Sequence, residues 1–197
     1  MTTTASSSAL SQRLKHETAP QHERMHALMA TADPFASRAQ YARFVAAQYV
    51  FQRDVEHLFA DAQVQTAVPD LAERGRADAS LADLHDLEAP VPTAALATEG
   101  VTMPEALGWL YVSEGSTLGA AFLFKEVGDK LGLTAEFGAR NLAAYPEGRA
   151  RVWKRFVEAL DAPALAAVHE QVIAGALAAY DRFGDLLEAQ FTSDATA

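Results

Sequence analysis

The sequence predicts a single all-α domain. Apolar residues recur at helical spacing over most of the chain, strand-like alternation is absent, and prolines and capping residues divide the chain into helix-length segments. At 197 residues the chain is long enough for one domain with a substantial core. We expect tails at residues 1–9 and 193–197, and one folded domain at residues 10–192.

The first two helices are marked by apolar periodicity and a capping residue. Apolar positions from Leu10 to Met29 lie at helical spacing, and Pro20 is expected to kink or restart this first helix. Ser37 is a candidate N-cap for a second helix that runs to about Asp61. The apolar residues of that second helix wrap widely around its axis, which is typical of a buried helix.

The middle of the chain changes from polar to apolar. Residues 63–98 are polar and proline-containing, and they predict one or two short helices joined by loops. Thr102, followed three residues later by Glu105, resembles a capping box. We therefore expect a long helix that begins near Met103 and continues to about Gly128.

Two prolines mark the last helices. Pro146 suits the first turn of a helix that continues to Leu160, and Pro163 is expected to open the final one. The final helix carries a long apolar stripe: Ile173, Leu177, Tyr180, Phe183, Leu186, Leu187 and Phe191. Together the segments predict one helical bundle.

Composition and charge exclude several classes of function. The net charge of −10 and the absence of a Lys/Arg cluster argue against a nucleic-acid partner. The chain has no cysteine, which excludes disulfides, thiolate metal sites and a cysteine nucleophile. Residues 1–8 lack the features of a signal peptide, and no apolar stretch approaches the roughly 20 residues of a membrane span. These features predict a cytoplasmic protein that does not enter a membrane.

A short histidine motif lies near the N-terminus. His22-Glu23-Arg24-Met25-His26 matches H-E-x-x-H, which in zinc proteases places two metal ligands on one helix face. Such a short pattern also arises by chance, and zinc needs a third protein ligand. No Gly-x-x-His extension follows His26. A zinc hydrolase is therefore an alternative that the motif alone supports weakly.

A glycine pair interrupts the long central helix. Gly115 and Gly119 each lower helix stability by about 1 kcal/mol relative to alanine, and together they leave a bare stripe on one face. The stripe fits either close packing of another helix or a flat ligand lying against exposed backbone. It also allows the helix to bend, with Ser116 and Thr117 available to hydrogen-bond freed carbonyls.

His22 is also a candidate heme ligand. Apolar and small residues flank it at helical spacing, including Met25 and Met29, which suits an imidazole that points toward iron over an apolar floor. His26, one turn further on, is either a neighbouring pocket residue or a surface side chain. A plain helical interaction domain remains a further alternative, in which the aromatic residues are only core.

The residues in and around these motifs match a known family. The blocks, in chain order, begin with Gln21-His22-Glu23-Arg24-Met25-His26-Ala27-Leu28, Asp33-Pro34-Phe35-Ala36-Ser37-Arg38, Tyr41-Ala42-Arg43-Phe44, Tyr49-Val50-Phe51-Gln52, and Ala106-Leu107-Gly108-Trp109-Leu110-Tyr111-Val112-Ser113-Glu114-Gly115-Ser116. Leu118-Gly119-Ala120-Ala121-Phe122-Leu123-Phe124 and Arg182-Phe183-Gly184-Asp185-Leu186-Leu187 complete the set. These blocks span nearly the whole chain. The sequence resembles the bacterial heme oxygenases, both those of iron acquisition and those linked to phytochromes.

The resemblance implies a heme-oxygenase-like bundle with heme b sandwiched between two helices. His22 falls at the proximal iron-ligand position, and Gly115, Ser116 and Gly119 fall on the distal helix as the catalytic segment. Tyr180 and Phe183 fall among the heme-contacting residues. The implied reaction consumes O₂ and electrons, and converts heme to biliverdin, carbon monoxide and ferrous iron.

Several positions bear on how heme is held. Ser116 stands where mammalian-type enzymes carry an Asp, so the distal water network has a different anchor. Lys15, seven residues before His22 and so two turns away on the same helix face, is expected to reach a heme propionate, and Tyr111 lies one turn before Gly115. The pseudomonad subtype that rotates its heme has Asn and Phe at these two positions, and Lys in place of Glu126. The resemblance therefore implies the unrotated subtype and cleavage mainly at the α-meso carbon.

The resemblance also implies partners. They are heme, O₂, an electron donor (a ferredoxin, a flavoprotein reductase or ascorbate) and, in the phytochrome-linked members, a bacteriophytochrome that accepts biliverdin. A non-catalytic heme carrier or sensor on the same scaffold remains the alternative, since both need His22 and an apolar slot. The glycine pair favours the enzyme.

Overall fold

The computed structural model describes residues 9–68 and 70–192, and within them the regular elements are helices, with only isolated bridges at Thr134. This confirms the all-α prediction. The helices are α1 (Leu10–Glu17), α2 (Ala19–Ala32), α3 (Arg38–His57), α4 (Ala62–Ala67), α5 (Ala77–Asp86), α6 (Glu105–Leu131), α7 (Arg149–Leu160) and α8 (His169–Thr192). Of the expected tails, residues 1–8 and 193–197 lie outside the described residues.

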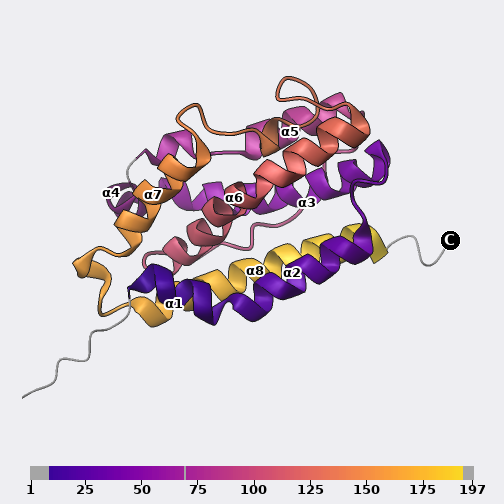
Figure 1. Cartoon of the computed structure of the whole chain (residues 1–197). Helices are drawn as coiled ribbons and strands as arrows, with labels where there is room; N and C mark the ends of the chain where they lie inside the picture. The colour runs from indigo at the N-terminus through magenta and orange to yellow at the C-terminus, as the bar shows by residue number, and fades with distance from the viewer. Residues whose placement is uncertain (1–8, 69, 193–197) are drawn as a thin grey trace, which may run out of the picture.

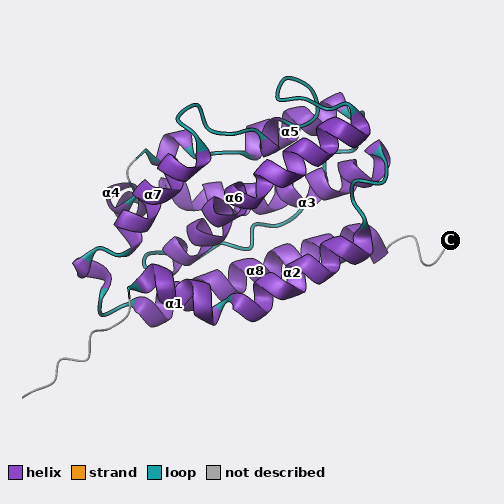
Figure 2. Ribbon diagram, viewed as in Figure 1, coloured by secondary structure: helices purple, strands orange, loops and turns teal. Residues whose placement is uncertain are grey.

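The helices form two layers that share α8 as their link. Figure 1 shows α1, α2 and α8 running along one side of the molecule, with α3, α5, α6 and α7 on the other side. Helix α8 packs against α6, α3 and α2, while α2 makes its main contacts with α8 rather than with α6. Figure 2 shows two long loops on the α5 and α7 side of the bundle and another loop that crosses between the two layers. The arrangement places α2 and α6 on different layers of the same bundle.

The expected breaks in the N-terminal half are confirmed. The first helix stops at Glu17, and Pro20 stands in the first turn of α2, where its missing N–H is no loss. Ser37 caps α3, because its Oγ accepts a hydrogen bond from the backbone N–H of Gln40 at 3.1 Å. Residues 63–98 contain the short helices α4 and α5 and the loops between them, as expected.

The predicted capping box of the central helix is wrong. Helix α6 begins at Glu105, and no side chain caps it. Thr102 Oγ1 instead lies 3.4 Å from the carbonyl oxygen of Met103. Pro104 accounts for the later start, because the residue before a proline is disfavoured in the helical region. The helix also continues past Gly128 to Leu131, where Gly132 ends it in the left-handed region at φ 67°.

The two prolines expected to open the last helices do not do so. Pro146 lies in a turn, and α7 begins three residues later, after Gly148 at φ 89°. Pro163 opens only a 3₁₀ turn that ends at Leu165, and α8 begins at His169. In both cases the proline starts a tight turn that changes the chain direction before the helix begins.

A very close backbone contact joins α6 to α8. A Cβ atom placed on Gly108 would lie 2.1 Å from the carbonyl oxygen of Val172, and one on Gly175 would lie 2.1 Å from that of Glu105. Both distances are far inside van der Waals contact, so the crossing requires glycine on both helices. This crossing holds the beginning of α6 against α8, the helix that shares a layer with α2.

Two apolar clusters make up the core. One surrounds the beginning of α6, the middle of α8 and α7, and the other joins α3 to the C-terminal half of α6. Tyr180, Phe183 and Leu186 of α8 pack against both clusters. None of the helices in the part of the chain that the structure describes is long and apolar enough to cross a membrane.

Candidate functional site

One wall of the candidate site is the exposed side of α2. His22 and His26 lie one turn apart, both are exposed, and their ring centroids are 4.5 Å apart. Met25 is buried against α8, where its methyl group approaches Gly184. Helix α2 therefore has one side fixed to α8, while its two imidazoles stay accessible.

The second candidate wall is the middle of α6. A Cβ on Gly119 would meet nothing within 4 Å, and one on Gly115 would make only an ordinary 3.7 Å contact with Trp153. Leu118 and Phe122 are 37% and 80% exposed, although both are large and apolar. The glycine stripe is thus not a close helix–helix contact, and it continues into uncovered apolar side chains.

The two walls meet at Tyr111 and Thr18. Thr18 is buried just before α2, and its Oγ1 donates to the carbonyl oxygen of Leu14 at 2.7 Å. The same hydroxyl lies close enough to that of Tyr111 on α6 to affect the pKa of Tyr111. Burial raises the pKa of Tyr111 to about 12, so this hydroxyl stays protonated. One turn beyond this junction lie His22 on α2 and Gly115 on α6, and Figure 1 shows the two helices running from it in the same general direction.

The carbonyls of α6 near the glycine pair are held by hydroxyl groups, as the sequence predicts. Ser116 Oγ donates to the carbonyl oxygen of Ser113 at 2.7 Å, and Thr117 Oγ1 donates to that of Glu114 at 2.6 Å. Ser116 itself is exposed. These bonds stabilise carbonyls one turn back from each hydroxyl, in the segment where a bend would weaken the helical hydrogen bonds.

The other predicted site residues lie around this junction to different degrees. Tyr180 is half-buried on α8, and its hydroxyl also lies close enough to Thr18 for Thr18 to affect its pKa. Phe183, one turn further on, contacts Phe51 with ring centroids 5.3 Å apart, so it belongs largely to the core. Lys15 is exposed on α1 and forms no ion pair within the described part of the chain.

Contrary to the prediction, Lys15 and His22 do not lie on one face of a single helix, because α1 ends at Glu17 and α2 begins at Ala19. Thr18 between them has φ −99° and ψ 5°, outside both helices. Lys15 therefore reaches the site only from the neighbouring helix.

The remaining sides of α6 at the glycine pair are anchored to the protein. Glu114 is buried, and its carboxylate accepts hydrogen bonds from Arg74 at 2.5 Å and from the hydroxyl of Tyr145 at 3.0 Å. Arg149 donates to the carbonyl oxygen of Thr117 at 2.8 Å. Ser113 Oγ donates to Gln52 of α3 at 3.1 Å, and both of these residues are buried. These contacts fix the segment that carries the bare glycines.

Glu114 experiences opposing electrostatic effects. Burial raises the pKa of its carboxyl group, while the positive charge of Arg74 and the hydroxyl of Tyr145 act in the opposite direction. Arg74 also forms an ion pair with Asp70, at 2.8 Å. The guanidinium is therefore compensated by two carboxylates in the interior.

Sequence reasoning missed these anchors. Glu114 was available as a signal, because a carboxylate inside the most apolar helix of the chain needs a buried partner. Its partners Arg74 and Tyr145 come from a loop region and a turn far away in sequence, so only the fold identifies them. The Gly108–Gly175 crossing was missed for a similar reason, since neither glycine reveals its partner.

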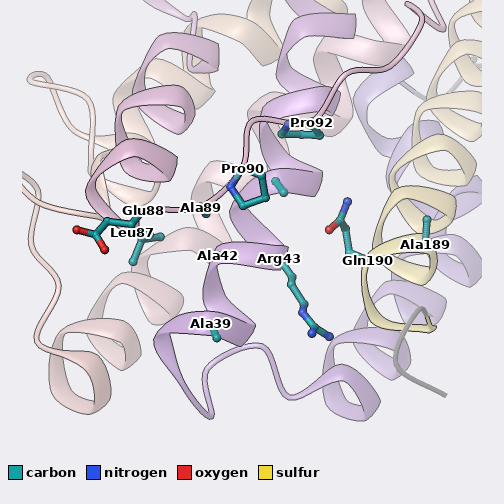
Figure 3. Close-up of a pocket in the computed structure, with 11 residues that line it drawn as sticks. Ala39, Ala42, Arg43, Leu87, Glu88, Ala89, Pro90, Pro92, Ala189 and Gln190 are labelled. Carbon is teal, nitrogen blue, oxygen red and sulfur yellow. The ribbon is translucent and has the colours of Figure 1, made fainter. Parts of the chain in front are cut away.

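A hollow on the surface lies elsewhere. It has a volume of about 520 Å³ and is lined by α3, residues 87–92 and the end of α8. Figure 3 shows Leu87 and Glu88 on one side of it and Ala189 and Gln190 on the other, with Pro90 and Pro92 above. None of the predicted site residues lines this hollow.

The histidine motif lacks the ligand set of a zinc hydrolase in the part of the chain that the structure describes. No group of three or more His, Asp or Glu side chains gathers there in a way that could hold a metal ion. What the site does offer is an accessible imidazole on one wall, and bare backbone with apolar side chains on the other. Such a pair of walls suits a flat, largely apolar ligand that carries a metal ion.

Comparisons with known proteins identify the family of the chain. The family model described as "Heme oxygenase" matches residues 8–189. "Heme oxygenase PigA" of Pseudomonas aeruginosa is 50% identical over 184 residues, which is 92% of each chain.

Solved structures give the same result. The heme oxygenase from Neisseria meningitidis, solved with NO and CO bound, is 36% identical with a TM-score of 0.87, and the match covers 97% of this chain and 96% of that one. The heme oxygenase from Leptospira interrogans is 18% identical with a TM-score of 0.76, over 92% of this chain and 99% of that one, and supports the fold alone.

Proposed function

Because the chain belongs to the heme oxygenase family, we propose that it binds one heme b between α2 and α6 through His22 and opens this heme mainly at the α-meso carbon. Heme is then both cofactor and substrate. When bound, it supplies the iron at which O₂ is activated, and the products are biliverdin, carbon monoxide and ferrous iron. The residues of the chain bind and orient the heme and keep one side of the iron open.

The observation that carries the proposal is the pair of unlike walls that diverge from Tyr111 and Thr18. His22 is accessible one turn along α2, and Gly119 has free space over its Cα two turns along α6. An iron ligand on one side only leaves the other coordination position free. The missing side chains at Gly115 and Gly119 let the backbone of α6 approach the ring closely.

Tyr111 and the hydroxyls of α6 would serve as hydrogen-bonding groups at the edges of the site. With its pKa raised to about 12, Tyr111 stays a hydrogen-bond donor at neutral pH. Ser116 is exposed on the glycine segment, and its hydroxyl donates to a backbone carbonyl while its oxygen can still accept a hydrogen bond. It is therefore available to orient water on the open side.

The α-meso preference rests on three positions. Lys15 is an exposed cation without an ion pair among the described residues, which suits a heme propionate. Tyr111 closes the end of the site next to α2. Glu126 is an anion, so it does not attract a propionate toward the far end of α6. It also pairs with the nearby cation Lys130 of the same helix, at 2.6 Å.

A heme titration tests the ligand and the reaction together. Hemin added to the heme-free protein should give a Soret band, and reductant with air should then convert the heme spectrum to that of biliverdin. His22→Ala should abolish or shift the axial ligation of ferric heme, whereas the matched variant His26→Ala should leave it nearly intact. An unchanged heme spectrum under reductant and air would refute the enzymatic assignment, and the reverse variant pattern would refute His22 as the ligand.

Product chromatography tests the α preference separately. Wild-type turnover should give mainly α-biliverdin. The triple variant Lys15→Asn, Tyr111→Phe, Glu126→Lys should shift the product toward the β and δ isomers, because it removes the cation at one end of the site and adds one at the other. Mostly β or δ product from the wild type would contradict the proposal.

The reaction also needs electrons and a fate for its product. We expect the donor to be a ferredoxin, a flavoprotein reductase or ascorbate, and a bacteriophytochrome to be a candidate acceptor of biliverdin. Stopped-flow reduction of the heme-bound protein with each donor, at matched driving force, ranks the donors directly.

A further inference from the structure

The second histidine of the H-E-x-x-H motif has no role in the function proposed above. His26 lies one turn after His22 on α2, is exposed, and holds its ring centroid 4.5 Å from that of His22. Residues four apart lie on the same helix face, so both imidazoles project to the same side. Two imidazoles in this relation can share one metal ion.

Helix α2 is held so that this pair is kept in place. Arg24, between the two histidines in sequence, projects to α8, where it forms ion pairs with Asp181, Asp185 and Glu188 at 3.6, 3.7 and 2.8 Å. Its guanidinium also lies over Gly184, where a Cβ would be 3.0 Å away. The helix is therefore fixed along its opposite side, and little freedom is lost when both rings bind one ion.

We propose that the heme-free protein binds one divalent transition-metal ion through His22 and His26, and that this ion and heme exclude each other. The inference rests on the proposed function, because exclusion follows from the use of His22 by both. No third His, Asp or Glu completes the set in the described ranges, so water fills the other coordination positions. Such an open nitrogen site binds copper(II) more tightly than nickel(II) or zinc(II).

The charge of the protein favours a cation at this site. The chain carries a net charge of −10, and Glu23 is exposed between the two histidines in sequence. The nearby arginine is neutralised by three carboxylates of α8 and does not oppose the ion. The site thus differs from a protease zinc site in having two protein ligands and no enclosing cleft.

A copper titration of the heme-free protein tests the site. Electron paramagnetic resonance should show one tight copper(II) per chain with hyperfine structure from two nitrogens. Because chelation by two linked groups strengthens binding, His26→Ala should weaken this copper about a hundredfold. The matched control His16→Ala removes an exposed histidine of α1 and should leave the copper signal unchanged. Circular dichroism checks that each variant is folded. If His26→Ala is not folded, His26→Gln takes its place.

The heme-loaded protein supplies the second arm. Copper should fail to bind at this site once heme is present, and copper-loaded protein should take up hemin only as copper is removed by a chelator. Copper affinity unchanged in His26→Ala, or copper and heme bound together with two-nitrogen hyperfine structure, would overturn the inference.

The two failures can be told apart. If His22→Ala keeps normal heme ligation, the proposed function of His22 fails. If His22 ligates heme but His26 does not affect copper, only the metal site fails.

Discussion

Two kinds of glycine occur in α6, and they have opposite reasons to be glycine. Gly108 lies where the backbone of α8 passes so closely that a Cβ would be 2.1 Å from the carbonyl oxygen of Val172. Gly119, three turns further along the same helix, has nothing within 4 Å of its Cβ position. The first glycine serves the packing of the bundle, while the second leaves space for a ligand.

The difference follows from what lies on each side of the helix. At Gly108 the helix is held by direct contact with α8. At Gly119 no atom of the described residues lies within 4 Å of the Cβ position, and at Gly115 only Trp153 of α7 approaches, at 3.7 Å. The segment is held by Glu114, Thr117 and Ser113 on its other sides. A helix with exposed backbone can keep its position when buried polar anchors replace the missing packing.

The largest expected effect comes from filling the packed glycine. Gly108→Ala should lower the free energy of unfolding by about 3 kcal/mol, the upper end for overpacking, because the atoms it meets are backbone atoms that cannot rotate away. Chemical denaturation of the heme-free protein measures the change. A loss below about 1 kcal/mol would show that α6 and α8 separate easily, and that the crossing is not what fixes α6.

Removing the buried anchor should have the next largest effect. Glu114→Ala leaves the Arg74 guanidinium buried with Asp70 as its remaining partner, and should cost about 2–3 kcal/mol, somewhat less than the loss of an isolated buried partner. The variant should also broaden the ferric heme electron paramagnetic resonance signal, because α6 is held less firmly over the heme. Unchanged stability together with an unchanged heme signal would rule out the anchoring role.

Filling the open glycine should change stability in the opposite direction. Gly119→Ala should raise the free energy of unfolding by up to about 1 kcal/mol, since alanine is the better helix former and nothing is displaced. The same methyl group projects toward the proposed ligand space, so hemin affinity and the rate of ring opening should fall. A stabilised variant with undiminished heme binding and turnover would remove Gly119 from the site.

Much of the fold follows from local sequence signals. The break before Pro20 and the cap at Ser37 each depend on neighbouring residues, and the structure confirms both. Pro146 and Pro163 misled because a proline suits a tight turn as well as a first helical turn, and the choice depends on where the chain must go next.

For the site, the sequence predicts which residues are unusual in their helices, but not which buried contacts hold those helices in place. The glycine pair and His22 stand out because each is unusual in its helix. Two explanations of the glycine pair fit the sequence equally well, and the choice required the space around Gly119, a property of the whole fold. The contact of Arg74 with Glu114 spans 40 residues, and no local pattern encodes that separation.

The smallest effect concerns how the anchor responds to pH. Burial raises the pKa of Glu114 in the folded protein above its ordinary value of 4.5. The folded state therefore binds this proton more tightly than the unfolded state, and the resulting stability is fully present below pH 4.5 and is lost as the pH rises through the folded pKa.

Glu114→Gln keeps a neutral side chain of the same size at every pH. Relative to this variant, the wild type should lose stability as the pH rises above 4.5, measured by urea denaturation at several pH values. If the wild type instead gained stability over this range, the charge of Arg74 would outweigh burial, and the anchor would be an ion pair at all these pH values.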